Sequence, residues 1–163
     1  MLTDYSNNRV VPSFDGVITG KWYGIARHKG CSFIKIIDSF VFISLKNNSV
    51  IEMTLVSFDV FNRKKISSFC GRVVAKTNDS CLVVAKGLLR KRIIMLGIDA
   101  HGFLYFSGRN SVKKQLFSKK IPVSKADVDG ALLGLSLDKA SFLYNECNVV
   151  LTPDVVGGFD IYF

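Results

Sequence analysis

The chain has 163 residues, of which 48% are hydrophobic, and it contains 13 phenylalanines but three prolines. This composition excludes an intrinsically disordered chain, and the length suits one domain with a substantial core. The sequence has no run of about 18 apolar residues, which argues against a transmembrane helix. A formal net charge of +9 would attract nucleic acid, an anionic membrane or an anionic ligand, but charges in turns can also serve solubility alone.

Segments typical of β-strands, separated by short polar turns, fill most of the chain. The strands contain β-branched and aromatic residues, and each turn contains Asn, Asp, Gly or Ser. Consecutive short turns require antiparallel neighbours, and eight such strands can close into an up-and-down barrel without exposed edges. The predicted strands span residues 20–29, 33–45, 50–61, 66–76, 81–86, 92–98, 103–107 and 113–118.

A helix is predicted over residues 125–136. Ser124 followed by Asp127 is typical of a helix start. One apolar stripe at helical spacing comprises Val128, Ala131, Leu132 and Leu135. Residues 142–150 are predicted to form a further strand. The sequence therefore predicts an all-β fold, an eight-stranded antiparallel up-and-down barrel with one C-terminal α-helix packed outside and a ninth strand.

The only tryptophan lies in a longer pattern that begins with Phe14-Asp15. The residues of this pattern that follow are Gly20, Trp22, Tyr23, Ile25, Ala26 and Arg27. The pattern resembles the first signature motif of the lipocalins, closest to the bacterial and apolipoprotein D branch, with one residue fewer before Gly20. The order of eight strands, helix and strand is also that of a lipocalin. The resemblance covers about residues 11–150 of a single domain of residues 1–163.

This resemblance implies how one end of the barrel is closed. In lipocalins an arginine after the eighth strand stacks on the motif tryptophan, and the matching residue here is Lys119. Lysine can make a cation–π contact but lacks the planar guanidinium group of arginine. We therefore expect Trp22 to lie against Lys119 at a closed end that is looser or braced differently.

Alternation of apolar and polar residues predicts which side chains face the barrel interior. The inward residues of the third and fourth strands are Ile51, Met53, Leu55, Phe69, Val73 and Ala75. Both faces of the second strand are apolar, and the resemblance selects Val41, Ile43 and Leu45. Phe40 and Phe42 would then face outward, where the helix or a partner could cover them. The predicted ligand-binding set is Val41, Ile43, Met53, Leu55, Phe69, Val73, Tyr105, Gln115 and Phe117.

No catalytic constellation is present. The two histidines, His28 and His101, lie far apart, and no metal-binding pair, phosphate loop or nucleophile elbow occurs. We therefore expect neither enzymatic activity nor a cofactor or metal.

The resemblance implies binding, storage or transport of a small hydrophobic or amphipathic ligand, similar to a fatty acid or lysophospholipid, in the barrel cavity. An anionic head would stay at the open mouth, where Lys46 and Lys76 are candidate partners. The alternative is a filled barrel that acts as an interaction module for an anionic partner or membrane surface. Nucleic acid is not the expected partner, and the oligomeric state is open.

The four cysteines are Cys31, Cys70, Cys81 and Cys147, and they form no Cys-x-x-Cys pair that would suggest zinc. Cys70 shares a strand face with Arg72, the outward set, which argues against a thiol in the cavity. The resemblance to secreted barrels implies a Cys70–Cys147 disulfide. Four reduced thiols in a reducing compartment are the alternative.

The location follows from the resemblance alone, which implies a periplasmic, outer-membrane-associated or secreted protein. The first eight residues lack the basic and apolar regions of a signal peptide, so the chain either starts after processing or stays in the cytoplasm. The tail, residues 151–163, alternates and ends in Phe163, which resembles the last strand of an outer-membrane barrel. The preceding helix and the short strands argue against that alternative, and the tail could instead pack on the barrel or pair with another chain.

Overall fold

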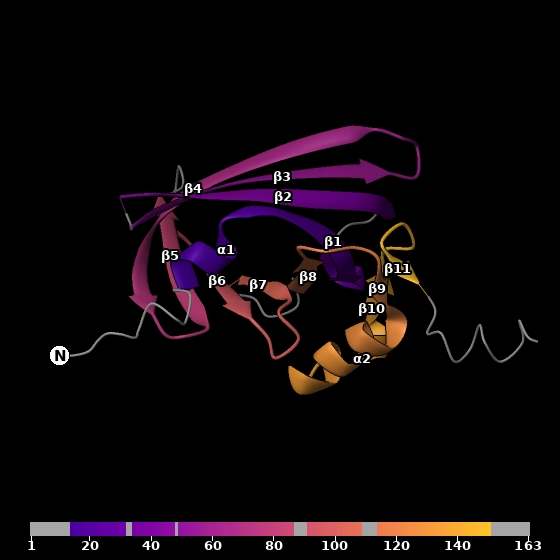
Figure 1. Ribbon diagram of the computed structural model, residues 1–163. Coiled ribbons are helices and arrows are strands. Elements are labelled where there is room, and N and C mark those ends of the chain that lie inside the picture. Colours follow the sequence, from indigo (N-terminus) through magenta and orange to yellow (C-terminus); the bar gives the residue numbers. More distant parts are fainter. Residues whose placement is uncertain (1–13, 32–33, 48, 87–90, 109–113, 151–163) are drawn as a thin grey trace, which may run out of the picture.

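The computed structural model describes residues 14–31, 34–47, 49–86, 91–108 and 114–150. Eight strands form a closed antiparallel barrel, because β8 pairs with β1 (Figure 1). They are β1 (Gly20–His28), β2 (Ile36–Lys46), β3 (Val50–Asp59), β4 (Lys64–Lys76), β5 (Ser80–Lys86), β6 (Lys91–Ile98), β7 (Leu104–Gly108) and β8 (Lys114–Ser118). The predicted fold class is confirmed, while the predicted tail, residues 151–163, lies outside the described residues. No helix in the described part of the chain is long and apolar enough to cross a bilayer.

The two ends of the barrel differ. Consecutive strands run antiparallel, so β1 begins at the end where the β2–β3, β4–β5 and β6–β7 turns lie, and Gly20 pairs there with Ile43. A short helix that the sequence did not predict, α1 (Phe14–Ile18), precedes β1 at this end. Ile18 is completely buried, which makes this the closed end. The β3–β4 turn, the last residue of β5 and the first residue of β6 lie at the opposite, open end.

Apolar side chains form two separate clusters. The first fills the closed half of the barrel and includes Ile18, Trp22, Ile43, Ile51, Val83, Leu96, Leu104 and Phe117. The second lies between the outer wall and α2 (Lys125–Gly134) and includes Ile25, Phe103, Leu116, Val128, Ala131, Leu132 and Phe142. The helix therefore packs outside the barrel, as Figure 1 shows, and leaves the interior to the strands.

The cap of α2 is the predicted one, because the Asp127 backbone N–H donates to Ser124 Oγ at 3.1 Å. A side-chain bond also joins the helix to the outer strand β10 (Phe142–Tyr144), since the Tyr144 hydroxyl donates to the Asp129 carboxylate. Burial, and then this bond, raise the pKa of Tyr144 to about 12, so the hydroxyl keeps its proton at neutral pH.

The predicted ninth strand, residues 142–150, is divided in two. After η3 (Lys139–Ser141), β10 pairs with β1, and β11 (Val149–Val150) pairs in parallel with β9 (Val123–Ser124). The intervening residues turn because the Asn145 side chain accepts a bond from the Cys147 N–H. Asn148 is buried and donates to the Gly24 carbonyl at 2.8 Å, which fastens the turn to β1.

A β-bulge corrects one of the inward predictions. The register between β4 and β5 shifts by one residue between Val73 and Ala75. Val73 pairs with Val83 and packs against the inner cluster, whereas Ala75 pairs with Leu82 and is exposed. Strict alternation does not allow for the extra residue of the bulge, so it wrongly assigns Ala75 to the inner face of the barrel.

The predicted Cys70–Cys147 disulfide is not formed, because the two cysteines lie at distant places on the barrel. Both cysteines are exposed, and Cys147 Sγ lies 3.5 Å from the Ile37 carbonyl at the start of β2. That part of the sheet meets β4 near Lys64, six residues before Cys70. Six residues of strand span about 20 Å, whereas a disulfide requires Cα atoms within about 7 Å.

The outward pair Phe40 and Phe42 is not covered by α2, but it is also not fully exposed. Phe42 is 46% exposed and Phe40 is half-buried. The Lys21 ammonium lies 4.5 Å from the Phe40 ring centroid and 5.6 Å from that of Phe42. The lysine therefore shields part of this face, and α2 packs on another side of the wall.

Candidate ligand-binding site

A cavity of about 600 Å³ occupies the half of the barrel toward the open end. Five residues predicted to bind ligand line it, namely Val41, Met53, Leu55, Phe69 and Gln115. Three further apolar residues of the lining were not predicted, namely Ile93, Ile94 and Phe106. Leu104, Phe106 and Ile94 face inward by the same alternation that identified the third strand, so the sequence contained this signal.

Three other residues of the predicted set lie deeper. Ile43 and Phe117 belong to the buried cluster of the closed half, where they are 3% and 0% exposed, and Val73 packs against that cluster. They form the filled part of the barrel beneath the cavity. The barrel is therefore filled at one end and hollow at the other.

The closed end centres on Trp22, which is 1% exposed. Its indole Nε1–H donates to the Ile18 carbonyl at 2.8 Å, so α1 and β1 are tied together through this side chain. The Lys119 ammonium lies 5.1 Å from the centroid of the Trp22 ring, within the range of a cation–π contact. The structure thus brings together the two residues that the family resemblance paired.

The mouth of the cavity carries cations that the sequence analysis missed. Lys91 and Arg92, at the start of β6, line the rim with Ser67 and Ser68 of β4. Arg92 shares a strand face with Ile94, and its guanidinium carbon lies 5.4 Å from the Phe69 ring centroid. Among the described residues, neither Lys91 nor Arg92 forms an ion pair.

The two cations predicted for the mouth lie at the other end of the barrel. Lys46 ends β2 and Lys76 ends β4, so both flank turns of the closed end. Lys46 Nζ also lies 3.2 Å from a Glu52 carboxylate oxygen. The predicted up-and-down order already implies this placement, because each hairpin reverses the direction of the chain and the first strand begins at the closed end.

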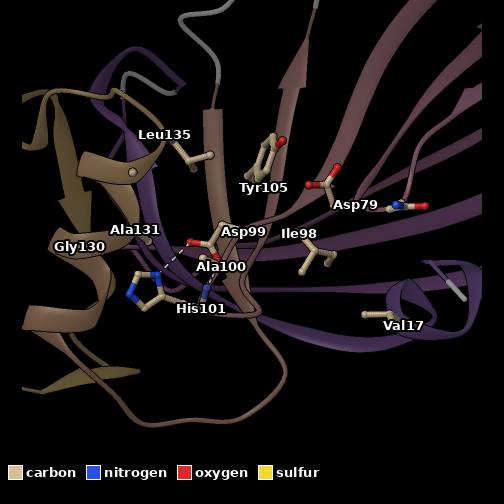
Figure 2. A pocket seen from close by; sticks show the side chains of 12 residues that line it. Val17, Asp79, Ile98, Asp99, Ala100, His101, Tyr105, Gly130, Ala131 and Leu135 are labelled. Carbon is tan, nitrogen blue, oxygen red and sulfur yellow. Dashed lines mark hydrogen bonds and ion pairs between the residues drawn. The ribbon is translucent and has the colours of Figure 1, made fainter. Parts of the chain in front are cut away.

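Tyr105 lies outside the lumen, which corrects its assignment to the ligand-binding set. Its neighbours Leu104 and Phe106 face inward, so Tyr105 faces outward, and its ring lies where a Cβ on Gly97 would come within 2.3 Å. It lines a separate pocket of about 450 Å³ between the closed-end turns and α2 (Figure 2). Burial raises the pKa of Tyr105, and the Asp79 and Asp99 carboxylates add to this shift.

Asp99 organises the turn beneath this outer pocket. Its Oδ1 accepts hydrogen bonds from the His101 and Phe103 N–H groups at 2.9 and 2.8 Å. Its other oxygen, Oδ2, lies 3.4 Å from His101 Nδ1, and Figure 2 shows the two side chains next to each other. Within the described residues, no group of three or more His, Cys, Asp or Glu side chains is placed to hold a metal ion.

Solved structures share this architecture. The amine-binding protein of Rhodnius prolixus, solved as its tryptamine complex, is 13% identical with a TM-score of 0.57, over 90% of this chain and 83% of that chain. A biogenic amine-binding protein is 11% identical with a TM-score of 0.55, over 99% of this chain and 94% of that chain. The major allergen Per a 4 from cockroaches is 16% identical with a TM-score of 0.53, over 96% of each chain. The barrel has the lipocalin fold.

This likeness concerns the fold, since the identities are low. No protein-family model matches the chain, and no curated protein matches it in sequence. Within the lipocalin fold, the closed end built on Trp22 and the half-hollow lumen are the features from which a function can be argued.

Proposed function

We propose that this chain binds a small amphipathic molecule with an anionic head, such as a fatty acid or a lysophospholipid, and carries it without chemical change. One observation supports this proposal above the others. The lumen is a cavity of about 600 Å³ with an apolar wall, and Lys91 and Arg92 stand at its rim. Its volume falls within the range of about 300–1,000 Å³ that small-molecule sites occupy.

The wall suits an aliphatic chain. Met53 is 5% exposed and Val41 completely buried, and the other apolar residues of the wall are half-buried. Each methylene that leaves water for this wall contributes about 0.8 kcal/mol. A chain of several methylenes would therefore supply most of the binding free energy, with its end toward the filled half of the barrel.

The rim suits an anionic head. A carboxylate or phosphate buried without a partner is strongly disfavoured, so the head would remain at the mouth where water reaches it. Lys91 and Arg92 are both exposed there, and Arg92 can form paired hydrogen bonds with a carboxylate or phosphate. Ser67, Ser68 and Gln115 add neutral hydrogen-bonding groups along the same lining.

The similar structures support ligand binding in general, whereas the cations at the rim support a negative charge on the ligand. The protein from Rhodnius prolixus is described as amine-binding, in complex with tryptamine. A cationic amine would meet Lys91 and Arg92 at the mouth, and neither of these cations forms an ion pair with another described residue. Like charges repel, so the rim favours an anion. The cavity also disfavours the alternative of a barrel filled by its own side chains.

The proposal is tested by comparing cis-parinaric acid with its methyl ester in a fluorescence titration. The acid is expected to bind more tightly at low salt, and the difference should shrink at high salt as the rim charges are screened. Arg92→Gln should weaken binding of the acid by about fivefold, because an exposed ion pair contributes about 1 kcal/mol. The affinity for the ester should stay unchanged.

Arg72→Gln is the matched control, because Arg72 is exposed on the outer face of β4 and lies outside the cavity lining. It removes the same charge and should leave both affinities unchanged. Equal affinities of acid and ester at low salt would rule out the anionic head. Failure of both probes to bind would rule out the lumen as a site for aliphatic ligands.

A further inference from the structure

The β3–β4 hairpin projects at the open end, as Figure 1 shows. Residues Lys64–Gly71 of β4 pair with β3, and in the described part of the chain β5 joins β4 only from Arg72 onward. Within the described residues, the β4 side of this hairpin therefore extends beyond β5, while β3 stays paired with β2 up to Asp59. Ser67 and Ser68, close behind the tip, line the mouth of the cavity.

The tip exposes large apolar side chains. Phe61 is 68% exposed, Ile66 58% and Val60 47%. The Val60 N–H donates to the Lys35 carbonyl at 3.0 Å, which places the β1–β2 connection beside the tip, and Ile34 in that connection is 37% exposed. We call Val60, Phe61, Lys64, Lys65 and Ile66 the hairpin tip. Exposed apolar side chains gathered at one place are typical of an interaction site.

The tip is held in one conformation by Asp59. Its Oδ1 accepts hydrogen bonds from the Phe61 and Arg63 N–H groups at 2.9 and 3.0 Å, and its Oδ2 accepts from Arg63 Nε at 2.9 Å. Asn62 adopts the left-handed conformation, with φ of 60°, which asparagine tolerates. The fold thus fixes Phe61 in an exposed position, with the Arg63 guanidinium carbon 5.0 Å from its ring centroid.

Exposed cations predominate around these apolar residues, although Asp38 pairs with Phe58 on the neighbouring strand and Glu146 is exposed next to Cys147, which contacts the start of β2. Lys64 and Lys65 are exposed within the tip, and Lys35, Lys91 and Arg92 are exposed at the same end. Asp59 is already paired with Arg63 and contributes no free negative charge. Exposed apolar residues surrounded by cations are suited to the surface of an anionic membrane. The apolar side chains can enter the head-group region, and each lysine adds to the electrostatic attraction to anionic lipids.

We propose that the hairpin tip docks the open end of the barrel on an anionic membrane surface, with Phe61 entering the head-group region. This inference rests on the proposed function for its purpose, because a mouth that faces the membrane can exchange a lipid with it. A nucleic acid or an acidic protein would use the lysines alone. The exposed Phe61, Val60 and Ile66 favour a membrane, because they would gain nothing from a purely charged partner.

The test is co-sedimentation of the full chain with vesicles of phosphatidylcholine, with and without phosphatidylglycerol. Binding is expected with the anionic lipid and not with phosphatidylcholine alone. Phe61→Ser should weaken it by about tenfold through the loss of buried apolar area. Lys64→Gln together with Lys65→Gln should weaken it by about fivefold for each charge.

Two controls match these variants. Phe42→Ser removes another exposed phenylalanine, which lies on the outer face of β2, and Arg72→Gln with Lys120→Gln removes two exposed cations away from the tip. Both should bind the anionic vesicles like the unmodified chain. Equal losses in Phe61→Ser and Phe42→Ser, or binding to heparin with no effect of Phe61→Ser on vesicles, would overturn the proposal.

Titration of the same variants with cis-parinaric acid separates this inference from the proposed function. Phe61→Ser should keep the affinity for the probe, because Phe61 does not line the lumen. Probe binding without vesicle binding in the unmodified chain would overturn the docking site and leave the lumen site standing. Vesicle binding without probe binding would support the docking site and overturn the lumen site.

Discussion

Replacing Leu55 with tryptophan is expected to abolish uptake of cis-parinaric acid while leaving the barrel folded. Leu55 lines the cavity from the middle of β3 and packs at the edge of the inner cluster. An indole ring at this position would project into the hollow half of the barrel, where the ligand chain is proposed to lie. The cavity offers space for the added ring, so the substitution should cost less stability than overpacking a filled core.

Thr54→Trp is the matched control for this prediction. Thr54 is the preceding residue of β3 and faces the opposite side of the sheet, and it does not line the cavity. This variant carries the same added ring but should keep the affinity for the probe. Circular dichroism and thermal unfolding check that both variants are folded. Unchanged binding by a folded Leu55→Trp variant would show that the ligand does not occupy this part of the lumen.

Trp22→Ala is expected to lower the free energy of unfolding by about 3–5 kcal/mol, the range for deleting a large buried side chain. Trp22 is 1% exposed, holds α1 through its bond to Ile18 and carries the Lys119 ammonium over its ring. The loss is measured by urea unfolding followed by circular dichroism, since the variant lacks the only tryptophan.

Two further variants divide the contribution of the closed end. Trp22→Phe keeps an aromatic ring but removes the Nε1–H donor, so it should cost less than Trp22→Ala. Lys119→Met removes the cation and should cost about 1 kcal/mol or less, because the contact lies at an exposed site. A loss below about 1 kcal/mol for Trp22→Ala would contradict the view that the closed end depends on this residue.

The sequence was sufficient for the fold class because the local signals agree with one another. Turns containing Asn, Asp, Gly or Ser separate β-branched strands, and left-handed Asn47 and Asn62 occur in two of the predicted turns. The Ser124 cap and the apolar stripe of α2 were also evident. The resemblance of the Trp22 motif then supplied the closed end, which neither alternation nor composition could have placed.

Some of the remaining details depend on contacts between distant residues. The bulge before Ala75 could be assigned only once the partner strand was known. The outward face of Tyr105, in contrast, follows from the alternation that places Leu104 and Phe106 inside. The rim position of Arg92 at the start of the sixth strand follows from the predicted strand order, whereas its contact with the Phe69 ring required the structure. The bacterial or apolipoprotein D branch and the cellular location stay predictions.

The central claim is that the hollow half of the lumen holds the aliphatic chain of the ligand, and methionine methyl resonances test it most directly. The chain contains three methionines, Met1, Met53 and Met95. Met53 lines the cavity, whereas Met95 follows Ile94 on β6, faces the opposite side and does not line it. In a sample with labelled methionine methyl groups, assigned with Met53→Leu, titration with palmitate should shift the Met53 signal and leave the Met95 signal in place. A shift of Met95 without a shift of Met53, or no shift of either signal at saturating palmitate, would contradict the account.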